Sequence, residues 1–424
     1  MPNPTASSPV RVIQIEDGVV IGIDDSTPIA VAGDLTVVQP SYQSDAGGRL
    51  RVSQLTTLGD YKPLVNDLSF FYDTVEIGGG SSNWTYNNAW FDFSVSSDGD
   101  AVIKQSFQRH PYSSGMSHYP EFTFLSFEPD DDVIKRAGYF RSSTVSPYTA
   151  GFDGIYLESS DGTVKLKIDR IGVNMVTIEQ AAWDNQSAAD NIDWDNFNVF
   201  FLDFLWLGGT SVRLFTVQEG APVLLHTYSH ANTTDSTMIR SPNLPIRYEM
   251  RSTGGSGWFS PVCAQVSSEG SVSLTGAVRS VNMGATKCDA DVVGTTYALV
   301  GIQLQSDHED TAVDILKLSV SATTNDDFLW ELRLNPTVAG TFTMSPVADS
   351  SVEYATGATA NTVTGGYVIK SGYGQGNSTI SDVSESVRRL GMAIDGTPDM
   401  LLLCVTPLGA NLDIYGALTF RERV

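Results

Sequence analysis

The stretch from Phe197 to Arg251 limits most tightly what this chain can fold into. Val199 to Leu207 is apolar at nearly every position, with Phe201 and Leu205 on one alternating face. The other face carries Phe200, Leu202, Phe204 and Trp206. A strand that faces water on one side alternates between apolar and polar residues, so this run predicts a strand covered on both sides. A buried helix through FFLDFLWL is the alternative, but the aromatic richness and the glycine pair that follows favour a strand.

Turn signals divide the rest of this stretch into further strands. Gly208 and Gly209 predict a turn, and Glu219-Gly220 predicts a second one. The strands expected between and after these turns are Val212 to Val217 and Val223 to Tyr228. Ile246, Tyr248 and Met250 then alternate with Arg247, Glu249 and Arg251, which is typical of a half-exposed strand. Three or four strands joined by tight turns predict an antiparallel meander.

The whole chain predicts an all-β fold: a short N-terminal arm and two antiparallel β-sandwich domains of jelly-roll or lectin-like type. Short strand-like runs recur between Asp-Gly and Pro-Asp turns. The chain has 424 residues, and a single core stops growing near about 250–300 residues. We assign residues 1–48 to the arm, 49–275 to a large sandwich and 276–424 to a C-terminal sandwich. The flexible sequence Thr253 to Gly257 is the best candidate for a junction, and a short helix is expected at Val383 to Leu390.

The N-terminal arm contains short apolar runs but too few residues to enclose them. Val10 to Ile15 and Val19 to Ile23 flank Glu16-Asp17-Gly18, which is a hairpin signal. An isolated hairpin would leave unpaired strand edges. The arm is therefore predicted to dock on a neighbouring protein or on another copy of the chain, and the body beyond Arg49 is predicted to fold without it.

Composition narrows the classes of partner. The chain carries 49 acidic and 25 basic residues, a formal net charge of −24, with no cluster of Lys and Arg. This charge argues against binding to nucleic acid or to an anionic membrane. No apolar run is long enough to span a membrane, and the first ten residues do not resemble a signal peptide. Cys263, Cys288 and Cys404 lack metal-ligand spacing and are expected to be free thiols, with a Cys263–Cys288 disulfide as the alternative.

Few residues carry a chemical signature. His226 and His230 are four apart, but they lie at a strand end rather than on a helix, so we interpret them as hydrogen-bonded structural residues. Asp130 to Asp132 and Ser97 to Asp100 are acidic, yet neither has the full ligand spacing of a calcium loop. The chain shows no nucleophile elbow, no phosphate-cradling loop and no distinguished carboxylate pair. The sequence therefore assigns no catalytic residue, metal ligand or cofactor.

Aromatic residues near polar loops are the remaining candidates for a site. These are Trp84, Tyr86, Trp90, Trp183 and Trp194. Aromatic rings beside amides and carboxylates suit a glycan, whereas the alternative is packing at a sandwich edge or a subunit interface. The sequence favours packing or an interface over a glycan site.

Six motifs together resemble a recurrent group of tailed-bacteriophage virion proteins. They begin with RLRVSQLTTLGDYKP (Arg49 to Pro63) and DFLWLGGTSVRL (Asp203 to Leu214). HTYSHAN (His226 to Asn232) and SPNLPIRYEM (Ser241 to Met250) follow, and WELRLNPTVAG (Trp330 to Gly340) and GGYVIKSGY (Gly365 to Tyr373) are similar to the group's C-terminal part. The likeness covers most of the chain beyond Arg49, whereas residues 1–48 fall outside it.

The resemblance implies a structural component of a virion, assembled in the host cytoplasm, and it carries over no catalytic residue. With the arm, it predicts a head or tail appendage or decoration protein, docked through residues 1–48 onto capsid or tail proteins. Appendages of this kind are commonly trimers, so a homotrimer is expected. The alternatives are a tailspike-type carbohydrate-active enzyme and an adhesin that binds a host glycan.

Overall fold

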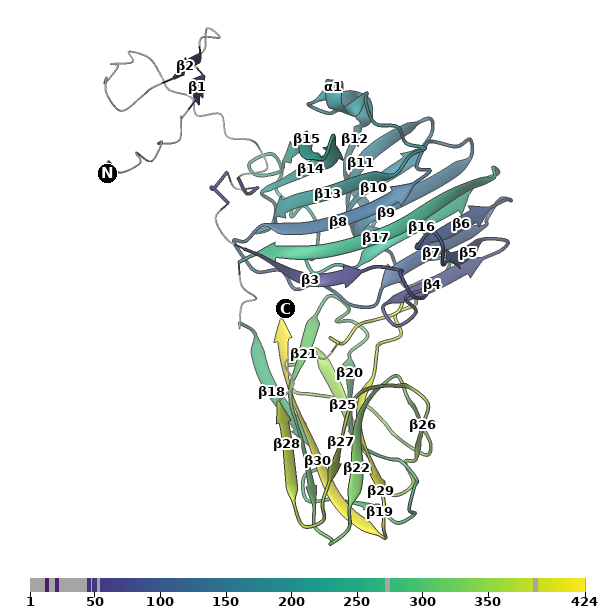
Figure 1. Cartoon of the computed structure of the whole chain (residues 1–424), viewed down its shortest axis with the longest axis vertical. Coiled ribbons are helices and arrows are strands. Elements are labelled where there is room, and N and C mark those ends of the chain that lie inside the picture. Colours follow the sequence, from purple (N-terminus) through teal and green to yellow (C-terminus); the bar gives the residue numbers. More distant parts are fainter. Residues whose placement is uncertain are drawn as a thin grey trace, which may run out of the picture.

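The protein consists of two stacked β-sandwiches (Figure 1). The computed structural model describes residues 44–46, 48–51, 54–270, 275–383 and 388–423, together with two strands of the preceding region. These strands, β1 (Val12–Gln14) and β2 (Val20–Gly22), pair antiparallel, which confirms the predicted hairpin. No described helix is long and apolar enough to span a membrane.

The large sandwich contains strands β3 to β17 in two antiparallel sheets. The seven-stranded sheet has the order β12 (Val173–Glu179), β11 (Thr163–Arg170), β10 (Asp153–Ser160), β9 (Val133–Arg141), β16 (Ile246–Ser252), β7 (Ala101–Ser106), β4 (Tyr72–Ile77). The eight-stranded sheet has the order β15 (Ala221–Ser229), β14 (Ser211–Gln218), β13 (Asn198–Leu205), β8 (His118–Leu125), β17 (Gly257–Glu269), β6 (Trp90–Val95), β5 (Ser81–Thr85), and β3 (Leu55–Tyr61) pairs with β17.

The expected meander is present for three strands only. β13, β14 and β15 are consecutive antiparallel neighbours, as predicted. The fourth strand, β16, instead crosses to the opposite sheet and pairs with β7 and β9. Its predicted half-exposure is also wrong, because Arg247 and Glu249 are fully buried. They form an ion pair with each other, and Arg247 donates to the carbonyl oxygen of Tyr148 in the loop that lies over this face.

The small sandwich contains strands β18 to β30. One sheet has the order β18 (Ala277–Asn282), β30 (Leu412–Arg423), β21 (Ala312–Ala322), β28 (Thr379–Val383), and β19 (Cys288–Ala290) pairs with β30. The other has the order β24 (Ser345–Pro346), β25 (Val352–Thr356), β20 (Tyr297–Leu304), β29 (Leu401–Pro407), β22 (Phe328–Leu334), β27 (Tyr367–Gly374), and β23 (Thr337–Val338) pairs separately with β26 (Val363–Thr364). Buried and half-buried residues alternate along β30.

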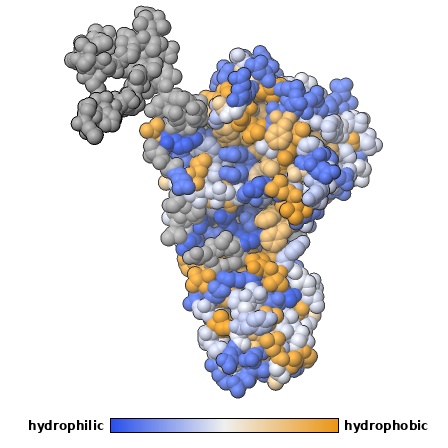
Figure 2. All heavy atoms as spheres, in the orientation of Figure 1, coloured by the Kyte–Doolittle hydropathy of each residue, from blue (hydrophilic) through white to orange (hydrophobic). Residues whose placement is uncertain are grey.

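Apolar side chains on the inner faces fill each sandwich. Phe200, Leu202 and Phe204 of β13 are fully buried in the core of the large sandwich, and a separate set of buried residues forms the core of the small one. The described cysteines are free, which confirms the thiol prediction. Figure 2 shows apolar residues on the visible face interspersed with polar ones.

One local prediction is wrong, and a second is only partly described. Thr253 to Gly257 is not a junction between domains but the turn between β16 and β17, both of which belong to the large sandwich. The centre of the helix expected at Val383 to Leu390 lies outside the described residues; at its ends, Val383 closes β28 and Leu390 forms a β-bridge with Val313. The helical elements among the described residues are the turn η2 (Gln180–Ala182) and α1 (Gln186–Ala189).

The two sandwiches meet through hydrogen bonds and ion pairs. Arg389 donates to the carbonyl oxygen of Leu58 over 2.9 Å, and Gly391 forms a β-bridge with Gln108. Asp310 of the small sandwich pairs with Arg141 at 3.1 Å and with Arg240 at 2.8 Å. Figure 1 shows the C-terminal end of β30 at this junction.

Candidate functional site

The outer face of the eight-stranded sheet carries a buried polar network centred on Asp203 of β13. Its carboxylate accepts hydrogen bonds from Ser117 at 2.6 Å and from Tyr119 at 3.1 Å. It also pairs with Arg51 at 3.0 Å and with Arg213 of the neighbouring strand β14. The side chain of Asp203 has no solvent exposure. Because buried charges are tolerated only when they are paired and hydrogen-bonded, this cluster explains how an acid interrupts the most apolar run of the chain.

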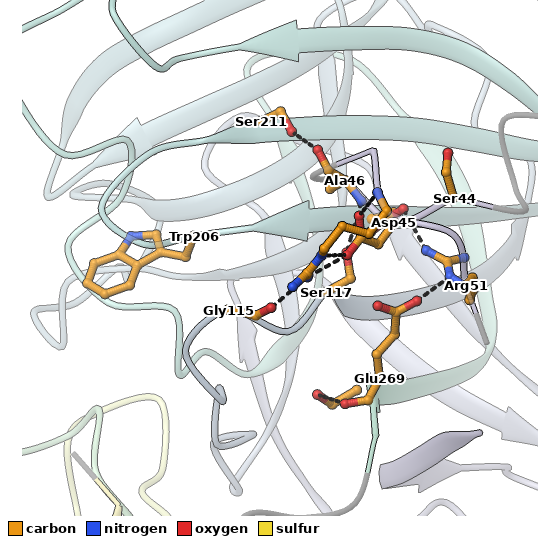
Figure 3. A network of polar contacts seen from close by, with 12 residues as sticks. Ser44, Asp45, Ala46, Arg51, Gly115, Ser117, Trp206, Ser211 and Glu269 are labelled. Atoms are coloured by element: carbon orange, nitrogen blue, oxygen red, sulfur yellow. Dashed lines mark hydrogen bonds and ion pairs between the residues drawn. The ribbon is translucent and has the colours of Figure 1, made fainter. Parts of the chain in front are cut away.

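Residues 44–50 form a tight turn that sits on this network. Ser44 bridges to Leu50, and Asp45 pairs with Arg49 at 2.5 Å. The backbone N–H of Ala46 donates to Ser117 over 3.1 Å, and its carbonyl oxygen accepts from Ser211 over 2.7 Å. Figure 3 shows Asp45 and Ala46 next to Ser117, and Arg51 directed toward Glu269. The end of the region assigned to the arm, residues 44–46 and 48, is therefore attached to the sheet rather than extended from it.

Arg51 links this turn to the body. Its Nε atom donates to Glu269 of β17, and its guanidinium lies 4.3 Å from the centre of the Tyr119 ring. Burial raises the pKa of Asp203, while the attraction of Arg213, the hydrogen bond from Ser117 and the charge of Arg51 act in the opposite direction. The partners of the Asp203 carboxylate described above are all protein groups. The network therefore has a structural role, which is to hold the turn against the sheet.

A second charged cluster lies on the outer face of the seven-stranded sheet. Arg136 of β9 pairs with Glu158 of β10 at 2.7 Å and with Glu249 of β16 at 2.5 Å. Burial opposes ionisation of Glu158, but Arg136 and then Lys167 outweigh it, and the net effect lowers the pKa of Glu158. A general acid for glycoside hydrolysis needs a raised pKa, so Glu158 lacks that property.

Sequence reasoning missed both clusters. The pairing Glu158–Arg136–Glu249 runs straight across three neighbouring strands, and one of them, β16, is far from the other two in the sequence. The signal that was present is the alternation of Arg247, Glu249 and Arg251, which we interpreted as exposure to solvent. Alternating charge on a strand equally suits a buried ion-pair ladder.

The structure divides the predicted aromatic residues into separate groups. Trp183 is buried and packs edge-on to Trp194, which stacks on the core residue Phe200 at 5.4 Å. Trp84 and the exposed Tyr86 contact each other at 5.8 Å in the hairpin of β5 and β6. Trp90, in β6, donates to Asp92 over 2.8 Å.

The histidines and acidic turns have structural partners. His226 pairs with Asp184 at 3.1 Å, and burial lowers the pKa of His226. His230 contacts the carbonyl oxygen of Ser236 at 2.7 Å. Asp130 pairs with Lys135 at 2.9 Å. Among the residues that the structure describes, no three His, Cys, Asp or Glu side chains are grouped to hold a metal ion.

Asp100 shows what one of these acidic turns does. Its carboxylate accepts backbone hydrogen bonds from Gly79 at 2.6 Å, Ser97 at 2.9 Å and Ser96 at 3.0 Å. These hydrogen bonds, with that from Gly79 first, lower the pKa of Asp100. The side chain therefore holds two turns together.

Comparisons with known proteins give likenesses of structure only. No protein-family model matches the chain, and no curated protein matches it. One solved structure that resembles it is the carbohydrate recognition domain of Emp47p, with 10% identity over 51% of this chain and 98% of that one, at a TM-score of 0.34. A Bacillus licheniformis β-glucanase has 13% identity over 50% of this chain and 99% of that one, at a TM-score of 0.33. A Bauhinia forficata lectin in complex with GalNAc has 10% identity over 51% of this chain and 99% of that one, at a TM-score of 0.32.

Proposed function

We propose that this chain is a non-catalytic structural component of a tailed-bacteriophage particle, displayed as a surface appendage and docked through its N-terminal region. One observation carries the proposal. Arg51, Asp203 and Arg213 come from the two longest motifs that resemble phage virion proteins, and they meet in one buried network. That network holds the turn at residues 44–50, from which the docking arm departs.

The arrangement of the arm supports this role. Its end is fixed to the outer face of a sheet by Ser117, Ser211 and Arg213. The chain before residue 44 therefore starts at a defined place on the body. A fixed point of departure limits the orientations that an attached body adopts, which suits a particle with regular symmetry.

The absence of an enzyme activity is part of the proposal. Each member of the carboxylate pair Glu158 and Glu249 is held by Arg136. The pKa of Glu158 is lowered, and an ion-paired acid of this kind is a poor proton donor at neutral pH. Release of sugars from a host polysaccharide by the purified chain would contradict this part.

The attachment role is tested with two variants of the full chain and one truncation. A chain that begins at Ser44 keeps the turn and should melt like the full chain, but it should be absent from assembled particles. Ile13 and Ile21 face each other in the hairpin register, so the double substitution Ile13→Asp, Ile21→Asp places like charges opposite each other and weakens the hairpin.

This double variant should reduce incorporation while leaving the melting of the body unchanged. The double substitution Ile13→Val, Ile21→Val is the matched control and should be incorporated normally. Normal incorporation of the chain that begins at Ser44 would overturn the proposal, and so would normal incorporation of the aspartate variant.

Self-association is the second part of the proposed assembly. We expect a homotrimer, because closed cyclic symmetry satisfies the strand edges of identical arms. The mass of the purified full chain at micromolar concentration, measured by native mass spectrometry, should be three times that of one copy. The chain that begins at Ser44 should form a smaller assembly than a trimer. A trimer of that truncated chain would show that the arm is not what holds the copies together.

A further inference from the structure

The large sandwich contains a pocket at its open edge. The edge strands there are β4 of one sheet and β5 of the other, which are consecutive in the chain. The pocket has a volume of about 310 Å³. Its lining includes Asp67, Thr74, Glu76, Trp84, Phe91 and Lys104. Thr74 pairs with Lys104 across β4 and β7, and Trp84 pairs with Phe91 across β5 and β6, so each sheet supplies one wall.

The inner face of this edge is polar. Lys104 is 3% exposed, its Nζ atom donates to Thr74 over 2.8 Å, and it lies 4.1 Å from the centre of the Phe91 ring. Burial lowers the pKa of Lys104 to about 8, and Asp67, Asp73 and Glu76 act against this shift. Burying an ammonium group costs stability, so an apolar residue would serve packing better here.

The aromatic wall has a fixed orientation. The indole N–H of Trp84 donates to the carbonyl oxygen of Pro63 over 2.7 Å, which sets the plane of the ring. Tyr86, 71% exposed, stands edge-on to Trp84 at the rim. A preset aromatic ring beside a hollow offers a flat apolar surface to a ligand.

The hydrogen-bonding groups are mainly acceptors. Glu76 accepts from the backbone N–H of Ser82 over 2.6 Å through Oε1, which leaves Oε2 to accept from a ligand. Asp67 accepts from the backbone N–H of Ser69 over 3.1 Å, again through one oxygen. A ligand that fits therefore presents several hydroxyl donors and one apolar face.

We propose that this pocket binds a neutral pyranose unit of a glycan, with the sugar ring against Trp84 and its hydroxyl groups donating to Glu76 and Asp67. The volume lies at the lower end of the range for small-molecule sites and suits one sugar ring. The two carboxylates outnumber the one cation of the pocket, Lys104, so acidic sugars should bind more weakly than neutral ones. This inference goes beyond the proposed attachment role, since the pocket belongs to the body and is tested without particles.

The test is a titration of the full chain with methyl glycosides of glucose, galactose, mannose and N-acetylglucosamine, and with N-acetylneuraminic acid and glucuronic acid. Ligand-observed NMR and the fluorescence of tryptophan report binding. At least one neutral glycoside should saturate at millimolar concentration, and the acidic sugars should bind more weakly. Absence of saturation by all the neutral glycosides would overturn the proposal, as would preferential binding of an acidic sugar.

Three variants locate the binding. Trp84→Ala should abolish it, and Glu76→Gln, which keeps the size of the side chain, should weaken it about tenfold through loss of a charged acceptor. Trp258→Ala is the matched control, because Trp258 is 54% exposed and pairs with Ser94, whose side chain lies on the opposite face of the same sheet edge. Unchanged affinity in both Glu76→Gln and Trp84→Ala would place the sugar elsewhere and overturn the proposal, even if one variant were less stable.

Discussion

Asp203 illustrates how one residue sets the local structure of this protein. In the sequence it is the acid that interrupts the run from Val199 to Leu207. In the structure, its neighbours Leu202 and Phe204 face the core, and Asp203 faces the opposite side, where Arg51 and Arg213 neutralise it. The period of a strand predicted which side chains share a face. It could not predict what covers the second face, because the covering turn lies about 150 residues earlier in the chain.

Substitution of Asp203 should therefore destabilise the large sandwich. Asp203→Asn leaves the buried Arg213 without its carboxylate and leaves Arg51 with Glu269 alone, which should cost about 3 kcal/mol and lower Tm by about 10 °C. Tyr119→Phe removes one hydrogen bond from the same carboxylate and should cost about 1 kcal/mol. Asp98→Asn in an exposed turn is the control and should leave Tm unchanged. Equal Tm values for all three variants would show that the network does not stabilise the fold.

Two buried histidines make the large sandwich sensitive to acid. Burial lowers the pKa of both His110 and His118 from 6.5 to about 3. Between these pH values the unfolded chain takes up a proton at each ring and the folded chain does not, so stability falls as pH falls below about 6.5. From pH 7 to pH 5 the two residues should remove about 4 kcal/mol from the free energy of unfolding. Urea unfolding at both pH values measures this loss, and His118→Gln should roughly halve it; an unchanged loss in that variant would contradict the assignment.

At the scale of elements, glycine-rich sequence misled the prediction of a junction. The turn between β16 and β17 is held by the N–H of Thr253, which donates to Asp132 over 2.8 Å. A Cβ atom at Gly255 would lie 2.0 Å from the carbonyl oxygen of Asp131. Close backbone approach and interdomain flexibility both favour glycine, and the sequence alone does not distinguish them.

This turn gives a prediction opposite to the one that a flexible junction would give. Gly255→Ala must displace the backbone near Asp131 and should lower the free energy of unfolding by about 2 kcal/mol. Ser256→Ala, at an exposed neighbouring position, should change it by less than about 0.5 kcal/mol. Urea unfolding of the two variants decides the matter. A Gly255→Ala variant as stable as Ser256→Ala would mean that the turn adapts as a linker does.

Strand positions were predicted better than strand partners. Turn residues and apolar runs located β13, β14 and β15 close to their observed bounds, because both signals are local. The crossing of β16 to the opposite sheet depends on contacts with β7 and β9, which are far away in the sequence. At the first residue of the expected helix, Val383 pairs with Lys317 of β21 instead, because tertiary pairing overrides local propensity.

For the whole molecule, an all-β chain with two sandwiches could be predicted from turn spacing and length, but the way the sandwiches join could not. Arg109 and Arg388 lie in unremarkable polar sequence, yet both are buried at the junction. Arg109 donates to the carbonyl oxygen of Met392 over 3.3 Å, which crosses from one sandwich to the other. Such a contact follows from the final packing, so no local pattern reports it.

Arg388 should couple the unfolding of the two sandwiches. Its guanidinium donates to the carbonyl oxygen of Phe70, lies 4.7 Å from the Phe70 ring and 4.8 Å from the Phe107 ring, and pairs with Asp399 at 2.9 Å. Arg388→Ala removes these contacts across the junction and leaves Asp399, which is 2% exposed, without its cation.

In calorimetry the native chain should unfold in one transition, whereas Arg388→Ala should show two, with the small sandwich melting first because it keeps the unpaired Asp399. Lys317→Ala, on β21 away from Arg388, is the control and should retain a single transition. A single transition in Arg388→Ala, shifted by no more than that of the control, would show that the other junction contacts, those of Arg389 and Asp310 among them, are sufficient to couple the two sandwiches.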